Sequence, residues 1–361
     1  MESVVDNMLD FFNDKNVFIT GHTGFKGSWL SKILINAGAN VTGYSLAPPT
    51  EPSLFKISGI ENKMESVIGD IRDLDKLMST FEKAKPEIVI HLAAQPLVRD
   101  SYDDPRGTYE TNVMGTVNVL ECIRKNECVK SVLNVTTDKV YKNNEWAWGY
   151  RESDPLDGYD PYSNSKSCSE LVTHSYKNAF FTNSKVAIST ARAGNVLGGG
   201  DYAKDRIIPD CIRAVENAED IVVRNPHSTR PYQHVLEPLY AYLMIIKNQF
   251  ENKKYADYYN VGPDDSDCIT TGELVDLFCE KWEGFTGNKQ SWINKCDGGH
   301  HEAGFLKLDC SKLKSVFDWK PRWNVEQAIE KTVEWTQIYF DGNDVSLIMD
   351  EQIKDFSGGT I

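Results

Sequence analysis

Tyr162 and Lys166 form the residue pair in this chain whose types and spacing most directly suggest chemistry. They lie four residues apart in Pro161-Tyr-Ser-Asn-Ser-Lys166, which places the phenol and the ammonium on one face of a helix. The positive charge of the lysine is expected to lower the pKa of the tyrosine from about 10. The phenolate could then take a proton from a hydroxyl group while hydride leaves the carbon. A chain this rich in tyrosine and lysine contains such a pair by chance, so its meaning depends on the neighbouring motifs.

A glycine-rich turn near the start of the chain favours a dinucleotide site. Gly21, Gly24 and Gly27 are spaced three residues apart, directly after the apolar run 16–20. Such glycines permit a tight turn, a close approach of the backbone to a pyrophosphate and close packing of helix against sheet. An ordinary strand-to-helix turn is the alternative, but the position after the first strand favours the cofactor. The other turn residues expected to contact the cofactor are His22, Phe25 and Lys26, of which Lys26 could approach a phosphate.

Apolar runs alternate with helical stretches along the chain and predict a Rossmann-type α/β fold with a doubly wound parallel sheet. The expected strands cover residues 16–20, 40–44, 64–70, 87–94, 129–135, 186–192 and 258–262. Ligands of such sheets bind beyond the carboxyl ends of the strands. At these ends we expect cofactor contacts from Asp70, Ile71, Leu92, Ala93 and Ala94.

The sequence defines the adenosine end of the cofactor site less closely. An Asp or Glu is expected after the second strand, where it would hold the ribose hydroxyls, but residues 43–49 contain no acid. The choice between NAD and NADP therefore stays open at this point. Asp70, at the end of the third strand, could meet the adenine edge or could instead cap the next helix.

Composition argues against several other classes of protein. The 361 residues carry a formal net charge of −14 and no basic block, which argues against nucleic acid or an anionic membrane surface as a partner. The eight cysteines show neither Cys-x-x-Cys nor zinc-like spacing, so we expect no disulfide framework and no metal site. His300, His301 and Glu302 are interpreted as residues of a substrate lobe. An acidic N-terminal segment and the lack of a long apolar run predict a cytoplasmic protein that does not bind membranes.

Six motifs together resemble the extended short-chain dehydrogenase/reductase family, and the resemblance covers roughly residues 15 to 335. They are Gly21–Trp29, Leu92–Gln95, Thr137–Lys139, Tyr162–Lys166, Arg192–Asn195 and Arg224–Pro231. The resemblance is greatest to members that act on CDP-glucose. It implies NAD as the cofactor, a CDP-sugar as the substrate and a lyase reaction. That reaction is the redox-neutral dehydration to CDP-4-dehydro-6-deoxyglucose, in deoxysugar biosynthesis for cell-surface polysaccharides.

The resemblance also implies a role for each residue near the reacting sugar. Hydride would pass from C4 to NAD, water would leave across C5 and C6, and hydride would return to C6. Tyr162 would take the proton of the C4 hydroxyl, Thr137 would bond the same oxygen, and Lys166 would hold the nicotinamide ribose. Asp138, as a neutral acid, would protonate the departing C6 hydroxyl, and Lys139 would remove the C5 proton. Many relatives carry glutamate in place of Lys139, and a plain ion pair between Asp138 and Lys139 is the alternative.

Two lobes are expected. Residues 1–197 and 236–263 would form the NAD-binding Rossmann domain, and residues 198–235 and 264–345 a smaller, discontinuous C-terminal lobe that binds the nucleotide sugar. The chain after Asp341 is expected to be weakly held. Substrate contacts are expected from Gln95, Arg99, Asn195, Arg206, His227, Arg230 and His234.

Two other functions compete with dehydration. An NAD-dependent sugar-nucleotide 4-epimerase would share the fold, the cofactor and the tyrosine–lysine pair, but it needs neither Asp138 nor Lys139. A catalytically silent dinucleotide-binding regulator is the second alternative, and it has no reason to keep these residues together.

Relatives in this family commonly pair through two long helices. The candidate helices here cover residues 108–126 and 161–181. The chain is therefore expected to form a homo-oligomer, either a dimer or a tetramer.

Overall fold

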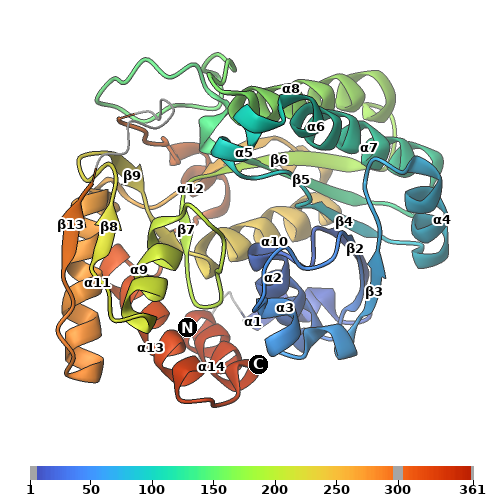
Figure 1. Cartoon of the computed structure of the whole chain (residues 1–361). Coiled ribbons are helices and arrows are strands. Elements are labelled where there is room, and N and C mark those ends of the chain that lie inside the picture. Colours follow the sequence, from blue (N-terminus) through green and yellow to red (C-terminus); the bar gives the residue numbers. More distant parts are fainter. Residues whose placement is uncertain (1–5, 296–303, 359–361) are drawn as a thin grey trace.

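A seven-stranded parallel sheet forms the centre of the computed structural model, which describes residues 6–295 and 304–358 (Figure 1). The strand order is β11-β6-β5-β4-β1-β2-β3, and every neighbouring pair is parallel. The strands are β1 (Asn16–Thr20), β2 (Asn40–Ser45), β3 (Glu65–Ile68), β4 (Ile88–His91), β5 (Ser131–Thr137), β6 (Ala187–Ala193) and β11 (Tyr258–Val261). Each corresponds to a predicted strand, so the prediction of a Rossmann-type doubly wound α/β fold is confirmed.

Helices cover both faces of the sheet because the central strands are apolar on both sides. Phe18, Val89 and Val132 pack under one layer of helices, whereas Ile19 and Ile90, one residue further along their strands, pack under the other. The first layer contains α4 (Leu74–Ala84), α5 (Val98–Asp103), α6 (Pro105–Tyr109), α7 (Gly115–Lys125) and α8 (Pro161–Tyr176), with π-helical turns η3 (Glu110–Met114) and η5 (Lys177–Phe181). The second contains α1 (Asp6–Leu9), α2 (Phe25–Asn36), α3 (Leu54–Ile57), α10 (Leu236–Glu251) and α14 (Val345–Ser357).

A separate, smaller hydrophobic core lies beside the sheet (Figure 1). Its members come from residues 197–232, 274–282 and 325–333, so segments before and after α10 contribute to one core. The elements around it are α9 (Ile207–Glu216), α11 (Thr271–Thr286) and α13 (Val325–Phe340), with the strand pairs β7 (Val196–Leu197) and β10 (Gln233–His234), β9 (Thr229–Pro231) and β12 (Cys268–Thr270), and β8 (Ile221–Val223) and β13 (Trp292–Asn294). The short helix α12 (Ser311–Phe317) packs against β11.

Residues 345–357 are firmly packed, which corrects the expectation that the chain after Asp341 is weakly held. Helix α14 buries Val345, Ile348, Met349, Ile353 and Phe356. Its Asp350 carboxylate pairs with Lys32 of α2 (Nζ–Oδ2 2.8 Å), and the Lys32 side chain is almost completely buried. The apolar residues recur with helical spacing and Asp344 caps the helix, so the pattern for this helix was present in the sequence.

The sequence predicted neither a membrane-spanning helix nor a metal site. Within residues 6–295 and 304–358, none of the helices combines the length and apolar character needed to cross a membrane. The same residues contain no group of three or more histidine, cysteine, aspartate or glutamate side chains placed to bind a metal ion. His300, His301 and Glu302 lie outside the described residues.

Candidate active site

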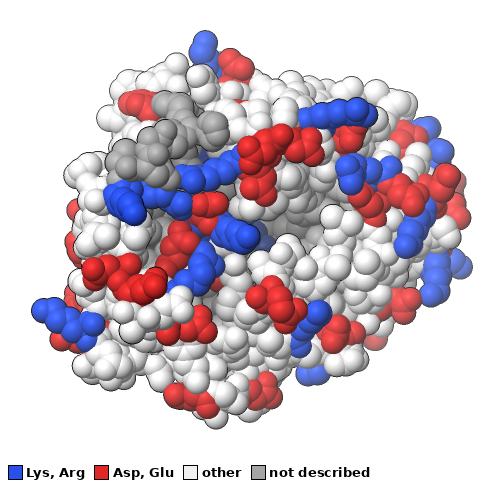
Figure 2. Space-filling model, in the orientation of Figure 1, with Lys and Arg blue, Asp and Glu red and all other residues white. Residues whose placement is uncertain are grey.

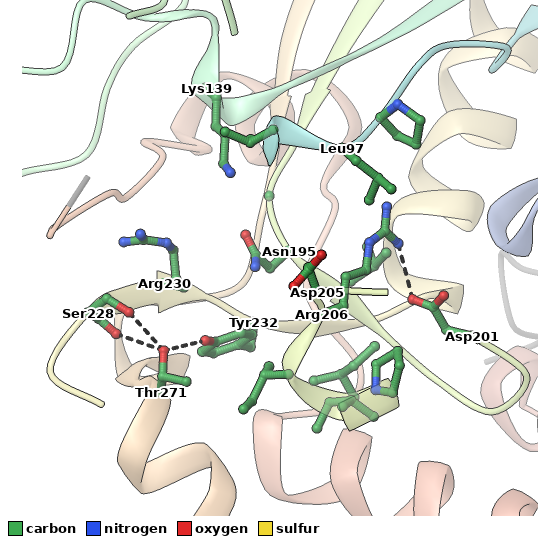
Figure 3. A pocket seen from close by; sticks show the side chains of 18 of the residues that line it. Leu97, Lys139, Asn195, Asp201, Asp205, Arg206, Ser228, Arg230, Tyr232 and Thr271 are labelled. Carbon is green, nitrogen blue, oxygen red and sulfur yellow. Dashed lines mark hydrogen bonds and ion pairs between the residues drawn. The ribbon is translucent and has the colours of Figure 1, made fainter. Parts of the chain in front are cut away.

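A cavity of about 550 Å³ opens between the carboxyl ends of β5 and β6 and the smaller core. The face of the molecule drawn in Figure 2 is hollowed near its centre, and basic and acidic side chains stand side by side around the hollow. Figure 3 shows side chains that point into the cavity from both parts of the chain, including Lys139, Asn195, Arg206 and Arg230. The position matches the rule that ligands of open α/β sheets bind beyond the carboxyl ends of the strands.

Tyr162 and Lys166 are brought to this cavity by the first turns of α8. Asp160 caps the helix by accepting a hydrogen bond from the Ser163 amide, and Tyr162 lines the cavity. The Lys166 ammonium donates a hydrogen bond to the Val135 carbonyl oxygen (3.1 Å), and burial lowers its pKa to about 8. The pair therefore lies on one helix face as predicted, but the lysine is bound to the neighbouring strand.

The prediction that Lys166 lowers the pKa of Tyr162 is wrong. Burial raises the pKa of the phenol to about 12, and the hydrogen bond with Thr137 opposes this rise only in part. The carboxyl group of Asp138 raises the pKa further, and Lys166 is not among the main influences on the phenol. The sequence spacing indicated which residues share a face, but it could not indicate which way the ammonium turns.

Asp138 is the buried acid of the site. It begins the 3₁₀ turn η4 (Asp138–Val140), directly after β5, and its Oδ1 accepts a hydrogen bond from Thr137 Oγ1 (2.9 Å). Its Oδ2 is buried and has no hydrogen-bond partner among the described residues. Burial raises the pKa of the carboxyl, against the opposing charge of Lys139. A raised pKa and a bare oxygen suit a carboxylic acid that donates its proton to a ligand.

Two lysine side chains line the cavity near this acid. Lys139 stands where the cavity meets a second one of about 290 Å³, and no ion pair joins it to Asp138 in the described part of the chain. Lys26 enters from the first turn of α2, and burial together with the charge of Arg206 lowers its pKa to about 8. Lys26 therefore reaches the reaction cavity from the cofactor turn.

The glycine turn between β1 and α2 fits a dinucleotide. Gly21 has φ +80°, and a Cβ there would lie 2.7 Å from the Ala93 amide nitrogen, so β4 closes tightly over the turn. A Cβ at Gly27 would collide with the Gly21 carbonyl oxygen. At Gly24, in contrast, the nearest atom would be at an ordinary 3.5 Å, which leaves the outer side of the turn open. The unpaired amides of the first turn of α2, which begins at Phe25, are the groups that bind pyrophosphate in this fold.

The His22 side chain packs inside the protein, so the predicted cofactor contact of this residue stays a prediction for its backbone. The ring is buried, lies against Gly43 of β2 and contacts Ser66 Oγ through Nε2 (2.8 Å). Any cofactor contact of His22 is therefore left to its backbone.

The remaining cofactor candidates lie at the predicted strand ends. Leu92, Ala93 and Ala94 follow β4, next to the glycine turn, and Ile71 is buried after β3 against Gly115. Asp70 binds the Arg72 side chain (Oδ2–Nη2 2.6 Å), which lowers the pKa of the carboxyl. Asp73 and not Asp70 caps α4, so the alternative of a helix cap is wrong.

Four of the seven predicted substrate residues line the cavity: Arg99, Asn195, Arg206 and Arg230. Gln95, His227 and His234 do not. The Gln95 side chain is bound within its own loop, to the Leu97 backbone and Thr108 Oγ1, and His227 is exposed outside the cavity. His234 is fully buried between two tryptophan rings, and burial lowers its pKa to about 3. A polar residue after a strand faces either a site or the core, and only the packing decides between them.

Other cavity residues were not predicted. They are Asp201, Asp205, Asp210, Arg224, Tyr232 and Thr271. Arg224 is the first residue of the Arg224–Pro231 motif, so the resemblance to the family could have indicated its place in the cavity. The aspartates had none, because acidic residues in a loop are normally solvated.

Comparisons with known proteins show which family this chain resembles. The family model described as GDP-mannose 4,6 dehydratase matches residues 18–332. A CDP-glucose 4,6-dehydratase from Salmonella typhimurium is 47% identical over 361 residues, covering 98% of this chain and 99% of that protein. The structure of an epimerase from Methanothermobacter thermautotrophicus covers 96% of this chain and 98% of its own, with a TM-score of 0.79 and 21% identity. A dTDP-glucose 4,6-dehydratase from Bacillus anthracis, in complex with NAD, covers 93% and 99%, with a TM-score of 0.74 and 21% identity.

The two solved structures, at this identity, establish the fold alone. The family model covers most of the chain, and the Salmonella protein is similar over nearly all of it. The chain therefore belongs to the GDP-mannose 4,6 dehydratase family of extended short-chain dehydrogenases/reductases.

Proposed function

We propose that the protein is an NAD-dependent lyase that converts CDP-glucose to CDP-4-dehydro-6-deoxyglucose. The observation that carries this proposal is the placement of Asp138, a buried acid with a bare Oδ2, in the same cavity as Tyr162. A 4-epimerase has no water to expel and no use for a second acid beside the tyrosine. The similarity to a CDP-glucose 4,6-dehydratase supports both the reaction and the CDP-sugar.

The first half of the reaction is an alcohol oxidation. NAD, held by the glycine turn and by Lys166, would supply the hydride acceptor for C4 and the hydride donor for C6. Tyr162 takes the proton of the C4 hydroxyl, and Thr137, which is hydrogen-bonded to it, holds the same oxygen. Burial raises the pKa of the phenol to about 12, and a positively charged nicotinamide ring beside it would favour the phenolate. The Lys166 ammonium donates a hydrogen bond to the Val135 carbonyl and would hold the nicotinamide ribose.

The second half removes water from C5 and C6. The C4 ketone makes the C5 proton acidic, and Lys139 removes it from the far side of the cavity. Asp138 donates its proton to the departing C6 hydroxyl, and a raised pKa keeps that proton available. The proton on Lys139 then returns to C5. The proton that Tyr162 took from the C4 hydroxyl passes through solvent to Asp138, so protons and electrons balance over the cycle.

The experiment is a substrate panel. Purified protein is incubated with catalytic NAD and CDP-, dTDP-, UDP- or GDP-glucose, and the products are identified by mass and NMR. A 4-keto-6-deoxy sugar from CDP-glucose supports the proposal. A C4 epimer without loss of water identifies an epimerase, and no turnover of any nucleotide sugar despite bound NAD leaves a silent dinucleotide-binding protein.

The division into lobes is part of the same proposal. We assign residues 1–197 and 236–263 to cofactor binding and residues 198–235 and 264–345 to sugar-nucleotide binding. The separate hydrophobic core of the second set supports this division, as does the cavity between the sheet and that core.

We also propose a homo-oligomer, with no nucleic acid or membrane partner. Helices α7 and α8 pack against each other, and Met114, Leu171 and Phe180 of this region are each about half exposed. A second copy would cover these side chains and form the dimer unit. Sedimentation of the wild type and of Leu171→Glu tests this, since only the variant should be monomeric. A cytoplasmic location is proposed with it, because the seven cysteines in the described ranges are free thiols.

A further inference from the structure

Three arginines that line the cavity are paired with aspartates that line it too. Arg206 Nη1 lies 3.1 Å from Asp201, and Arg224 Nη1 lies 2.6 Å from Asp205. Asp205 also reaches Arg99 Nη1 at 3.6 Å. The cations that should attract a nucleotide are therefore already balanced by carboxylates of the protein itself.

The aspartates have a physical reason to be there. Guanidinium groups gathered in a partly buried cavity repel one another and lose hydration, so an unbalanced cluster would be unstable. A carboxylate offers a guanidinium two oxygens in one plane, much as a diphosphate offers neighbouring oxygens. A carboxylate that pairs with two arginines thus supplies part of the negative charge that a diphosphate would bring to them.

Of these aspartates, Asp205 is the one whose side chain could most easily move away from its arginines when a ligand binds. Asp201 is almost completely buried beside Arg206, and Asp210 lies within helix α9 and also pairs with Arg213. Asp205 lies in the loop before α9, has a left-handed backbone (φ +57°), and its side chain is about one-third exposed. In Figure 3 its carboxylate stands in the cavity between Asn195 and Arg206.

Asp205 also joins elements that are far apart in the sequence. Arg99 comes from α5, in the helix layer of the large sheet, and Arg224 follows β8, beside the smaller core. The two arginines contact the same oxygen of this carboxylate, Oδ1. A ligand that replaces this carboxylate would be held by both parts of the chain.

We propose that the Asp205 carboxylate is a stand-in for the substrate's diphosphate: it holds Arg99 and Arg224 in place until a nucleoside diphosphate sugar displaces it. This inference rests on the proposed function for the nature of the ligand. It assigns Arg224 and Arg99 to the diphosphate and makes Asp205 a positioning residue that competes with substrate. After the reaction the same carboxylate recaptures the arginines and favours release of the product, which carries the same diphosphate.

The test is the sign of the effect of Asp205→Asn on affinity. Asparagine accepts the left-handed backbone, so the loop is kept while the charge is lost. Calorimetry with CDP and with cytidine, on the NAD-bound protein, should show CDP binding tighter by about three- to tenfold, with cytidine unchanged. KM for CDP-glucose should fall likewise. Arg224→Gln should instead weaken CDP binding by about tenfold or more and leave cytidine unchanged.

The controls separate competition from other effects. Asp210→Asn removes the same charge from the same cavity. Asp210 pairs with Arg224 (3.2 Å) but has no described contact with Arg99, so the change should alter CDP affinity less than Asp205→Asn. Asp205→Glu restores the charge and should return the affinity toward wild type. A weaker affinity for CDP in Asp205→Asn, as expected when a structural ion pair is lost, would overturn the inference. So would an equal gain for cytidine.

The inference can fail independently of the proposed function. UDP, dTDP and GDP are measured alongside CDP with both proteins. If another diphosphate binds and CDP does not, the proposed substrate is wrong, but the sign of the Asp205→Asn effect on that diphosphate still decides the role of Asp205. If wild type turns over CDP-glucose and Asp205→Asn binds CDP more weakly, only the inference is wrong.

Discussion

Glu170, one helical turn after Lys166 in α8, forms an ion pair with Arg192 of β6 (Oε2–Nη2 3.0 Å). Both side chains are almost completely buried. The carboxylate also accepts hydrogen bonds from Thr136 and Thr190 (2.5 and 2.7 Å), so it ties α8 to β5 and β6. The position of the Tyr162 helix over the sheet therefore depends on one charged network.

Replacement of Glu170 by alanine should destabilise the fold strongly. The change leaves the Arg192 guanidinium buried without its carboxylate, and such losses cost about 3–5 kcal/mol in the free energy of unfolding. Urea denaturation followed by circular dichroism measures it. Glu65→Ala is the matched control, because its partner Lys83 is largely exposed and the pair contributes less than about 1 kcal/mol. Equal losses in the two variants would show that the buried network does not hold the helix.

Asp138→Asn should stop the reaction after the first oxidation. The amide cannot protonate the C6 hydroxyl, so loss of water should slow by about 10²- to 10⁴-fold while C4 oxidation proceeds. Stopped-flow absorbance of NADH after mixing with CDP-glucose checks this. Wild type should show a transient signal and Asp138→Asn a persistent one. Normal product formation by the variant would remove Asp138 from the elimination.

Lys139 can be tested by isotope exchange. If it carries the C5 proton, wild-type product formed in deuterated water should contain deuterium at C5, as NMR will show. Lys139→Met should form little product and exchange none, whereas Lys139→Glu should recover part of both, since a carboxylate can also serve as the base. Full exchange with Lys139→Met would assign the base to another residue.

The glycine turn allows a matched pair of variants. Gly27→Ala forces a methyl group onto the Gly21 carbonyl and within 2.7 Å of the His22 Cα, so thermal stability should fall even without cofactor. Gly24→Ala meets only an ordinary 3.5 Å contact and should fold normally, but the new methyl group points to the open side and should weaken NAD binding. Thermal denaturation without and with NAD separates the two effects. Similar stability losses in both variants would contradict this description of the turn.

His234 should make the fold sensitive to acid. It is neutral when folded because burial lowers its pKa to about 3, but in the unfolded chain it takes up a proton below about 6.5. Unfolding therefore binds one proton as pH falls from about 6.5 toward 3, and stability is lost across that window by up to about 1.4 kcal/mol per pH unit. His234→Phe keeps a ring between Trp29 and Trp323 and should show a smaller slope. Urea denaturation of both proteins at pH 7.5 and 5 measures the difference, and equal slopes would show that His234 is not neutral when folded.

The fold was predictable because its signals are local. Each strand of the large sheet is a short apolar run, and Gly21, Gly24 and Gly27 mark the turn that begins the fold. The helix after Asp344 also carried a cap and apolar spacing and should have been predicted.

Site residues could be predicted only where a motif indicated both which residue takes part and which way its side chain points. Asp138 follows its strand directly and faces the cavity, and its raised pKa agrees with the acid role expected for it. His234 also follows a strand but turns into the core between two tryptophans. The direction of the Lys166 side chain could not be predicted from spacing. Its ammonium binds the Val135 carbonyl and is not among the main influences on the pKa of Tyr162. The pairing of Asp205 with Arg99 and Arg224 joins three distant segments and has no sequence pattern at all.

Lys32 and Asp350 are 318 positions apart in the chain, yet their contact anchors the helix that follows the glycine turn. On the ribosome, α2 emerges long before α14. Until then the Lys32 ammonium has no carboxylate, and the apolar side of α2 that α14 helps to cover is exposed. The helix that follows the glycine turn is thus made early but completed late, and a nascent chain still lacking Asp350 should be a client for chaperones rather than a cofactor-binding protein.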